Sequence, residues 1–386
     1  MQNMLEILPE FNVPDCVCGI LGDEKMLWEK LKPFVKDKNA GGALILSSVN
    51  RRYATGFPSS AGFVAITPEK TVFITDFRYY GSACEAKKQG KINSEVTVVL
   101  QDKTLWETLA GLFEGCDNIL IEENYVTVSE YERLSEKFAG KKLCNGASCA
   151  FEMLRAVKTD SELEKIVKAQ AVTDKAFAHI LSYISDNLGK GLTEKQVALE
   201  LDYFMLSNGA DGIAFDTIAV NAEKSAMPHG VPDNIPIKKG FLTMDFGARF
   251  DGYCSDMTRT VSIGKPTEKM RDVYDTVLNA QYKALEYISA GKTGKSIDGV
   301  AREYIASRGY DGCFGHSLGH SLGLEIHESP NFSPSNNSPI PEGAVISVEP
   351  GVYLDGEFGV RIEDIVSVKN GGCVNLTNSP KELIIL

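Results

Sequence analysis

The sequence predicts a chain of two domains, an α/β domain over residues 1–150 and an α+β domain over residues 155–386. Three observations support this fold class. The length of 386 residues suits two domains, or three, each with its own core. Short apolar segments alternate with helical patterns in the first 150 residues, as in α/β domains with a parallel or mixed sheet. Helices and β segments then form separate runs, as in α+β domains.

The first domain is expected to contain five strands, each a short apolar run. They cover residues 43–48, 62–67, 71–76, 96–101 and 118–123. The helical patterns that alternate with them cover residues 24–36, 78–89, 103–114 and 127–138. The character of the sequence changes near residues 145–155, where we expect the two domains to meet.

Four helices are expected in the second domain. The first begins at a capping box formed by Thr159 and Glu162 and ends before Gly189. The second also begins at a capping box, formed by Thr193 and Gln196. The last three helices cover residues 193–209, 267–290 and 296–308. The β segments cover residues 241–264, 344–350 and 359–372.

The composition excludes several classes of protein. A hydrophobic content of 43% and a charged content of 24% are those of an ordinary soluble protein. The net charge of -12, with no evident basic face, argues against binding to nucleic acid or anionic membranes. No apolar run approaches the ~18 residues of a membrane span, and the start MQNMLEILPEF does not resemble a secretory signal. We therefore expect a cytoplasmic protein.

The nine cysteines are odd in number and scattered along the chain. Cys16 and Cys18 form a C-x-C pair, but no second pair follows at a spacing typical of zinc sites. This pattern predicts free thiols in a reducing compartment.

Two aspartates stand out in the β segment 241–264. Asp251-Gly252 lies between Asp245 and Asp256 and predicts a turn, which would bring the two aspartates together on adjacent strands. An aspartate in an apolar strand is costly unless its charge is compensated. Taken singly, each could instead be a solvated edge residue or accept hydrogen bonds from turn amides.

Two glutamates occur in similar surroundings. Glu349 follows the apolar run AVISV, and Glu363 interrupts the apolar strand VRIEDIVSV. The alternative for Glu363 is a structural ion pair with Arg361, which lies two residues away on the same strand face.

Three of the five histidines, His316, His320 and His327, lie within GHSLGHSLGLEIHESP. Glycine and small residues flank His320 and leave room for an ion, and imidazole is a common metal ligand. Four carboxylates and one imidazole suit two divalent ions such as Mn²⁺, Co²⁺, Fe²⁺ or Zn²⁺. The predicted metal ligands are Asp245, Asp256, His320, Glu349 and Glu363.

The segments MDFGARFDGYCSDMTRT, GHSLGHSLGLEIHESP, SVEPGVY and GVRIEDIVSV resemble the "pita-bread" metallopeptidases of family M24. That family includes Xaa-Pro aminopeptidase, prolidase, methionine aminopeptidase and the non-metal enzyme creatinase. NRRYATGF and ITDFRYY resemble the N-terminal domain of the prolidase, aminopeptidase P and creatinase branch, which methionine aminopeptidases lack. The resemblance implies a creatinase-like N-terminal domain followed by a catalytic pita-bread domain.

Matched position by position, the family's metal ligands correspond to the five residues predicted above, and none is missing. The resemblance further implies that Glu349 transfers protons and that His327 and His229 polarise the scissile carbonyl. It places His316 beside the substrate's proline, Arg361 against the ligand carboxylates and, less directly, Tyr353 in the substrate site. The alternative for His316 and His327 is that they are core histidines that support the site.

The implied function is that of a dinuclear-metal hydrolase, with Mn²⁺ the expected ion, that removes the first residue from short peptides with proline second. The alternative is prolidase, which cuts only Xaa-Pro dipeptides because its site is closed behind the proline. Candidates for that closure are Arg51, Arg52, Arg78 and Tyr79, which could equally be solvated surface residues. A homodimer is expected. A creatinase-like amidinohydrolase and a non-catalytic binding module remain as alternatives that metal content would distinguish.

Overall fold

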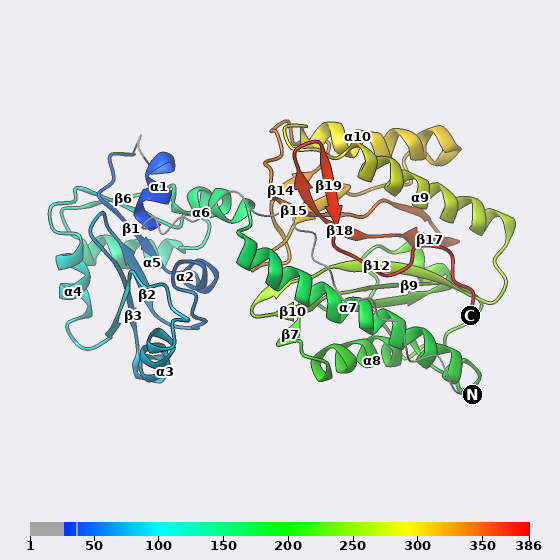
Figure 1. Ribbon diagram of the computed structural model, residues 1–386, viewed down its shortest axis with the longest axis horizontal. Helices are drawn as coiled ribbons and strands as arrows, with labels where there is room; N and C mark the ends of the chain where they lie inside the picture. The colour runs from blue at the N-terminus through cyan, green and yellow to red at the C-terminus, as the bar shows by residue number, and fades with distance from the viewer. Residues whose placement is uncertain (1–26, 36–37) are drawn as a thin grey trace.

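The computed structural model describes residues 27–35 and 38–386, and it confirms the predicted fold class (Figure 1). Cys16, Cys18 and the start of the expected helix 24–36 lie outside the described residues. The blue-to-cyan α/β domain and the green-to-red α+β domain lie side by side, and α6 (Ala147–Ala156) occupies the junction between them (Figure 1). No helix in the described part of the chain has both the length and the apolar content needed to cross a membrane.

The first domain contains one mixed sheet of six strands in the order β4-β3-β2-β1-β5-β6. Only β2 runs antiparallel to its two neighbours, β1 and β3. Alternate residues face two different clusters, with Ala43 and Ile45 on one face and Leu44 on the other, so both faces are buried. The strands are β1 (Gly42–Ile45), β2 (Phe63–Ile66), β3 (Thr71–Thr75), β4 (Val96–Leu100), β5 (Asn118–Ile121) and β6 (Lys142–Cys144).

Helices cover both faces of this sheet. The cluster on one face contains residues of α1, α2, α3 and α6, and that on the other contains residues of α4 and α5. The sequence analysis missed α2, α6 and β6, because α2 is polar, β6 is three residues long and α6 lies at the expected domain junction. The first five helices are α1 (Leu27–Val35), α2 (Ser48–Thr55), α3 (Phe77–Lys88), α4 (Leu105–Leu112) and α5 (Val128–Lys137).

The second domain places its β sheets between two pairs of helices, α7 and α8 on one side and α9 and α10 on the other (Figure 1). Both predicted capping boxes, at Thr159 and Thr193, are confirmed. The first of these helices ends at Asn187, before Gly189 as predicted, but a 3-10 turn follows α7 and the left-handed residue is Gly191 and not Gly189. The helices are α7 (Asp160–Asn187), α8 (Glu194–Ser207), α9 (Glu268–Tyr287) and α10 (Gly294–Ile305).

The predicted hairpin is present, and Asp251 and Gly252 form its turn with positive φ angles of 43° and 80°. The three-stranded sheets are β12-β9-β8 and β11-β10-β7. In the first of them, β9 and β12 pair antiparallel over seven residue pairs. The strands are β7 (Gly212–Ile213), β8 (Ile218–Asn221), β9 (Gly240–Phe246), β10 (Ala248–Phe250), β11 (Tyr253–Cys254) and β12 (Met257–Ile263).

The C-terminal β segments are shorter than predicted. The segment 359–372 was expected as one strand, but it divides between two sheets, ordered β14-β13-β15-β18-β19 and β16-β17. Glu363 therefore lies in the break between β17 and β18 and not inside a strand. The strands are β13 (Gly319–Ser321), β14 (Glu328–Phe332), β15 (Val345–Val348), β16 (Gly351–Leu354), β17 (Phe358–Arg361), β18 (Asp364–Lys369) and β19 (Gly372–Asn375).

Candidate metal centre

A cavity of ≈ 510 Å³ in the second domain collects all the predicted metal ligands. Asp245 and His320 lie within strands, β9 and β13, whereas the other three ligands lie at breaks between strands. Asp256 precedes β12, Glu349 follows β15 and Glu363 follows β17. A strand break frees the side chain from the alternation of the sheet, so carboxylates from several strands can point into one cavity.

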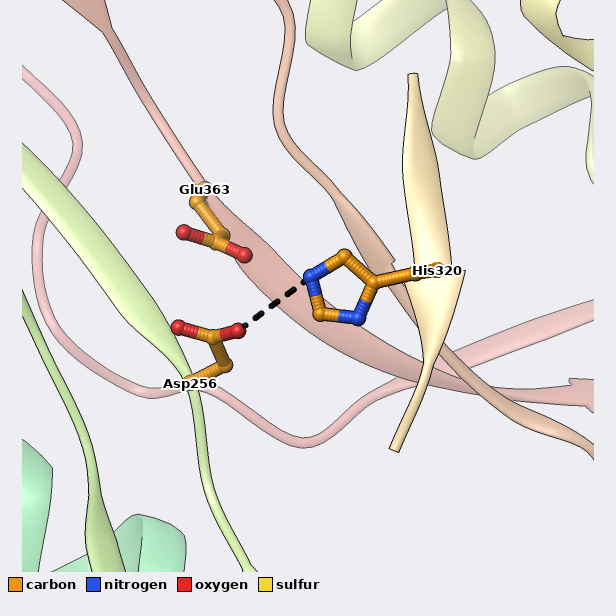
Figure 2. Close-up of side chains that lie close together, drawn as sticks. All are labelled: Asp256, His320 and Glu363. Atoms are coloured by element: carbon orange, nitrogen blue, oxygen red, sulfur yellow. Dashed lines mark ion pairs between the residues drawn. The ribbon is translucent and has the colours of Figure 1, made fainter. Parts of the chain in front are cut away.

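Three of the predicted ligands form the tightest group (Figure 2). One ligand atom each of Asp256, His320 and Glu363 lies within 4.8 Å of the others. Nε2 of His320 is 3.6 Å from Oδ2 of Asp256 and 3.4 Å from Oε1 of Glu349. Asp245 lines the same cavity outside this tightest group.

Arg361 and Thr258 hold the carboxylates in place. Nη2 of Arg361 donates to Oδ2 of Asp245 at 2.7 Å, and its Nε donates to Oγ1 of Thr258 at 3.0 Å. The hydroxyl of Thr258 donates to Oε2 of Glu363 at 2.7 Å. The alternative considered for Glu363, an ion pair with Arg361, is not formed: Arg361 pairs with Asp245, and Thr258 links the arginine to Glu363.

Ser347 provides a second link that the sequence analysis missed. Its hydroxyl accepts from the backbone N–H of His320 at 3.0 Å and donates to Oε1 of Glu349 at 3.0 Å. Thr258 and Ser347 could have been sought in the sequence, since Thr258 faces Asp245 across the hairpin and Ser347 shares a strand face with Glu349.

The residues fit divalent cations. Among the described residues, Oδ1 of Asp245 and Oε1 of Glu363 are buried without a hydrogen-bond partner, which is costly for a carboxylate. Burial and the charges of neighbouring carboxylates raise the pKa of Asp256 and of Glu363 well above their usual values. Burial, with the charge of Asp245, raises the pKa of Glu349 to about 7. Bound cations would supply the counter-charge that these oxygen donors need.

His316 lines the cavity, whereas Tyr353, which the resemblance placed in the substrate site, is not a lining residue and contacts the site through His316 and Arg361. Nδ1 of His316 lies 2.9 Å from the carbonyl oxygen of Ser317, which can only accept, so Nδ1 carries the proton. Nε2 then accepts from the hydroxyl of Tyr353 at 2.9 Å, and that hydroxyl accepts from Nη1 of Arg361 at 2.8 Å. Burial and the charge of Arg361 lower the pKa of His316 to about 4. His316 is therefore a neutral ring with both nitrogens engaged.

His229 and His327 lie at the exposed rim of the cavity. Neither ring forms a hydrogen bond within the described part of the chain, and the ring of His327 lies edge-on to that of His320 with centroids 4.4 Å apart. Burial and the neighbouring histidines lower the pKa of His327. Both imidazoles are thus available to a ligand that enters the cavity.

A buried ion-pair cluster anchors the segment that carries His327, and the sequence contained no signal for it. Oε1 of Glu328 accepts from Nη2 of Arg155 at 2.5 Å, and its Oε2 accepts from Nζ of Lys158 at 3.1 Å. Arg155 also donates to Asn50 of the first domain at 3.1 Å. Lys158 also donates to the hydroxyl of Ser321 in β13 at 3.2 Å, so the junction between the domains contacts both β14 and β13, the strand that carries His320.

The four residues suggested for closure of the site are engaged elsewhere. Arg52 pairs with Asp251 at 3.1 Å, Arg78 pairs with Asp76 at 2.7 Å, and Arg51 donates to the carbonyl oxygen of Leu46. The hydroxyl of Tyr79 lies 2.7 Å from that of Ser60. None of the four lines the metal-ligand cavity of this chain.

Comparison with known proteins identifies relatives over nearly the whole chain. The Creatinase/Prolidase N-terminal domain matches residues 28–157, and metallopeptidase family M24 matches residues 164–370. A Xaa-Pro dipeptidase from Pyrococcus furiosus is 35% identical, covering 92% of this chain and 99% of that protein.

Two solved structures share the architecture of both domains. A Xaa-Pro dipeptidase from Bacillus anthracis is 38% identical, with a TM-score of 0.86 and coverage of 93% of this chain and 98% of that one. An X-Pro aminopeptidase from Thermotoga maritima is 37% identical, with a TM-score of 0.82 and coverage of 91% and 99%.

Proposed function

We propose that this chain, which belongs to metallopeptidase family M24, hydrolyses the bond between an N-terminal residue and a following proline. The observation that carries this proposal is the convergence of one imidazole and four carboxylates on a single cavity whose wall is the neutral ring of His316.

Asp245, Asp256, His320, Glu349 and Glu363 would hold two divalent ions. Mn²⁺ is our expectation, although the same donors suit Co²⁺, Fe²⁺ and Zn²⁺. When bound, such ions acidify water and polarise a carbonyl oxygen. Arg361, Thr258 and Ser347 keep the donors in position through the hydrogen bonds described above.

Glu349 is the candidate for proton transfer. Ser347 donates to its Oε1, which fixes the direction in which the carboxylate presents its other oxygen. A carboxylate in this position can take the proton of the attacking water and deliver it to the proline nitrogen as that nitrogen leaves. His229 and His327, whose rings form no hydrogen bond with the described residues, would donate to the scissile carbonyl.

His316 is suited to a proline side chain. The nitrogen of an Xaa-Pro peptide bond belongs to the proline ring and carries no hydrogen, so a proline-specific site needs no acceptor for it. With both its nitrogens engaged, His316 presents ring surface and C–H edges, against which a pyrrolidine ring can pack. Phe314 supports the imidazole edge-on, with ring centroids 5.0 Å apart.

We infer that the preferred substrates are Xaa-Pro dipeptides, because relatives at 35% and 38% identity carry the name Xaa-Pro dipeptidase. One observation favours an aminopeptidase that accepts longer peptides. Among the described residues that line the cavity, Arg361 is the only lysine or arginine, and its guanidinium already donates to Asp245 and Tyr353. A dipeptide's carboxylate would then need a cation from elsewhere, such as the partner in a homodimer.

The test is hydrolysis of Gly-Pro, Gly-Pro-Ala and Gly-Ala by the protein stripped with chelator and reloaded with Mn²⁺. Cleavage of Gly-Pro alone supports the dipeptidase. Cleavage of Gly-Pro-Ala between glycine and proline supports the aminopeptidase. Cleavage of Gly-Ala as fast as either proline substrate, or of no substrate, contradicts the proposal.

A further inference from the structure

Gln281 of α9 is buried behind the metal centre and contacts none of the proposed ligand side chains. We infer that Gln281 is a positioning residue for the metal centre. Its side-chain amide ties together the two backbone segments that carry Glu349 and Glu363. The inference rests on the proposed function only in taking these two carboxylates as metal ligands.

The geometry of the amide is specific. Nε2 of Gln281 donates to the carbonyl oxygen of Val348 at 3.0 Å and to that of Ile362 at 3.2 Å. These residues directly precede the two ligands Glu349 and Glu363. One nitrogen from a helix therefore joins equivalent positions of two segments that approach the cavity from different strands.

The side-chain amide of Gln281 contributes through its N–H groups, which donate to the two carbonyl oxygens. Both neighbouring groups are carbonyl oxygens, so the nitrogen must face them. Oε1 has no hydrogen-bond partner among the described residues although it is buried, which is unfavourable. An apolar side chain of similar size would avoid the unpaired oxygen, but it could not join the two carbonyls.

The link adds to the few backbone contacts of the two ligands, which both lie at strand breaks. The N–H of Glu349 donates to the carbonyl oxygen of Leu318 at 2.8 Å, and that of Glu363 donates to the carbonyl oxygen of Thr258 at 3.1 Å. Asp245 lies within β9, and its backbone is fixed by pairing with Thr258 on one side and Ile218 on the other. Glu349 and Glu363 lie outside the named strands, at the ends of β15 and β17. A hydrogen bond to the preceding peptide group limits rotation at each ligand's own backbone.

The helix that carries Gln281 is a firm support. Val277, Ala280 and Ala284 on α9 are fully buried in the cluster that also contains Val348 and Ile362. Buried residues before and after Gln281 on α9 therefore fix the position of the helix from which the amide extends. Residues that orient ligands without touching metal commonly change metal affinity by about 10- to 100-fold when they are replaced.

The test compares Gln281→Met, which keeps the volume and removes the donors, with Gln281→Asn. The asparagine amide is shorter by one C–C bond, about 1.5 Å, so it cannot reach both carbonyls. Thr276→Val is the control, because Thr276 is buried on the same helix and its hydroxyl donates only to the carbonyl of Asp272. The readouts are Mn²⁺ binding by calorimetry, the absorption spectrum of bound Co²⁺, and the Mn²⁺-induced rise in Tm.

We expect both Gln281 variants to fold, to bind Mn²⁺ at least about 10-fold more weakly, to show an altered Co²⁺ spectrum and to gain less Tm from Mn²⁺. Thr276→Val should match the wild type. Unchanged affinity and spectrum in either folded Gln281 variant would overturn the inference. Failure of both to fold even with Mn²⁺ would also overturn it, since Gln281 would then serve the core. If the wild type binds Mn²⁺ but cleaves no proline peptide, the result contradicts only the proposed function and not the role of Gln281.

Discussion

The hydroxyl of Thr258 donates a 2.7 Å hydrogen bond to Oε2 of Glu363, 105 residues further along the chain. The same hydroxyl accepts from Nε of Arg361, whose Nη2 holds Asp245. One neutral side chain thus sets the direction of two proposed ligand carboxylates. Oε1 of Glu363, the oxygen that Thr258 does not hold, is the one that remains without a partner among the described residues.

Thr258→Val should therefore weaken Mn²⁺ binding and lower kcat/KM for Gly-Pro by about 10- to 100-fold, because Glu363 and Arg361 both lose an orienting contact. Ser262→Ala on the same strand is the control, since the Ser262 hydroxyl donates to the carbonyl of Gly264, away from the cavity. An equal loss of Mn²⁺ affinity and kcat/KM in the two variants would contradict the specific role of Thr258, because any hydroxyl of β12 would then have the same effect.

Asp256→Asn should abolish metal-dependent hydrolysis, with a loss of more than about 100-fold in kcat. Its metal-free form should nevertheless have a higher Tm than metal-free wild type at pH 8, because an amide removes one of several buried like charges. Asp355→Asn is the control, since Asp355 is exposed in the turn between β16 and β17 and forms no ion pair with the described residues. A lower Tm for metal-free Asp256→Asn would contradict this explanation of the cluster.

The metal-free protein should lose stability as pH rises. Burial, with the charge of Asp245, raises the pKa of Glu349 to about 7 from the ordinary value of 4.5. The folded state therefore binds more protons than the unfolded state between these values, and the free energy of unfolding falls as pH rises through them. The loss from Glu349 is on the order of 3 kcal/mol.

The check is the Tm of chelator-stripped protein at pH 6.5, 7, 7.5 and 8, with and without Mn²⁺. Above pH 6.5, Asp256 and Glu363, whose pKa values burial and neighbouring carboxylates raise well above the usual, add to the fall from Glu349. The Tm should fall with pH in the stripped protein and should vary much less when the carboxylates are neutralised by the ions. Measurements start at pH 6.5 because burial lowers the pKa of His316 to about 4, and the pKa of Glu328 is also lowered, which gives an opposite trend at lower pH. A rise in Tm from pH 6.5 to 8 would refute the prediction.

Arg155→Met should destabilise the protein by about 3 kcal/mol, because the buried carboxylate of Glu328 keeps only one charged partner, Lys158, beside the backbone N–H of Glu325. The measurement is urea denaturation. Arg308→Met is the control, since its pair with Asp272 is about half exposed and should contribute less than about 1 kcal/mol. A similar small loss in both variants would mean that the buried cluster does not anchor β14.

The sequence predicted most of this architecture because its signals are local. The apolar strands of the first domain, the capping boxes at Thr159 and Thr193 and the Asp251-Gly252 turn all follow from neighbouring residues. The carboxylates that line the cavity stood out for the same reason, since an acidic residue beside apolar β segments is unusual. Their roles as ligands remain a proposal.

The remaining features depend on contacts between distant residues. Gln281 reaches carbonyls 67 and 81 residues away, and Arg155 reaches Glu328 across 173 residues. The split of residues 359–372 between two sheets depends on which strands pair, and the apolar pattern is the same whether or not the strand is broken at Glu363. Exposed and buried arginines also look alike in the sequence, so Arg51 and Arg52 could not be assigned.

The metal dependence of the reaction is measured by the hydrolysis of Gly-Pro by stripped protein as Mn²⁺ is added stepwise, with bound ions counted by equilibrium dialysis. We expect no cleavage without metal, full activity when two ions are bound per chain, and neither binding nor cleavage at those Mn²⁺ concentrations in Asp256→Asn. Full activity in the stripped protein, or tight binding of two ions by Asp256→Asn, would contradict this expectation.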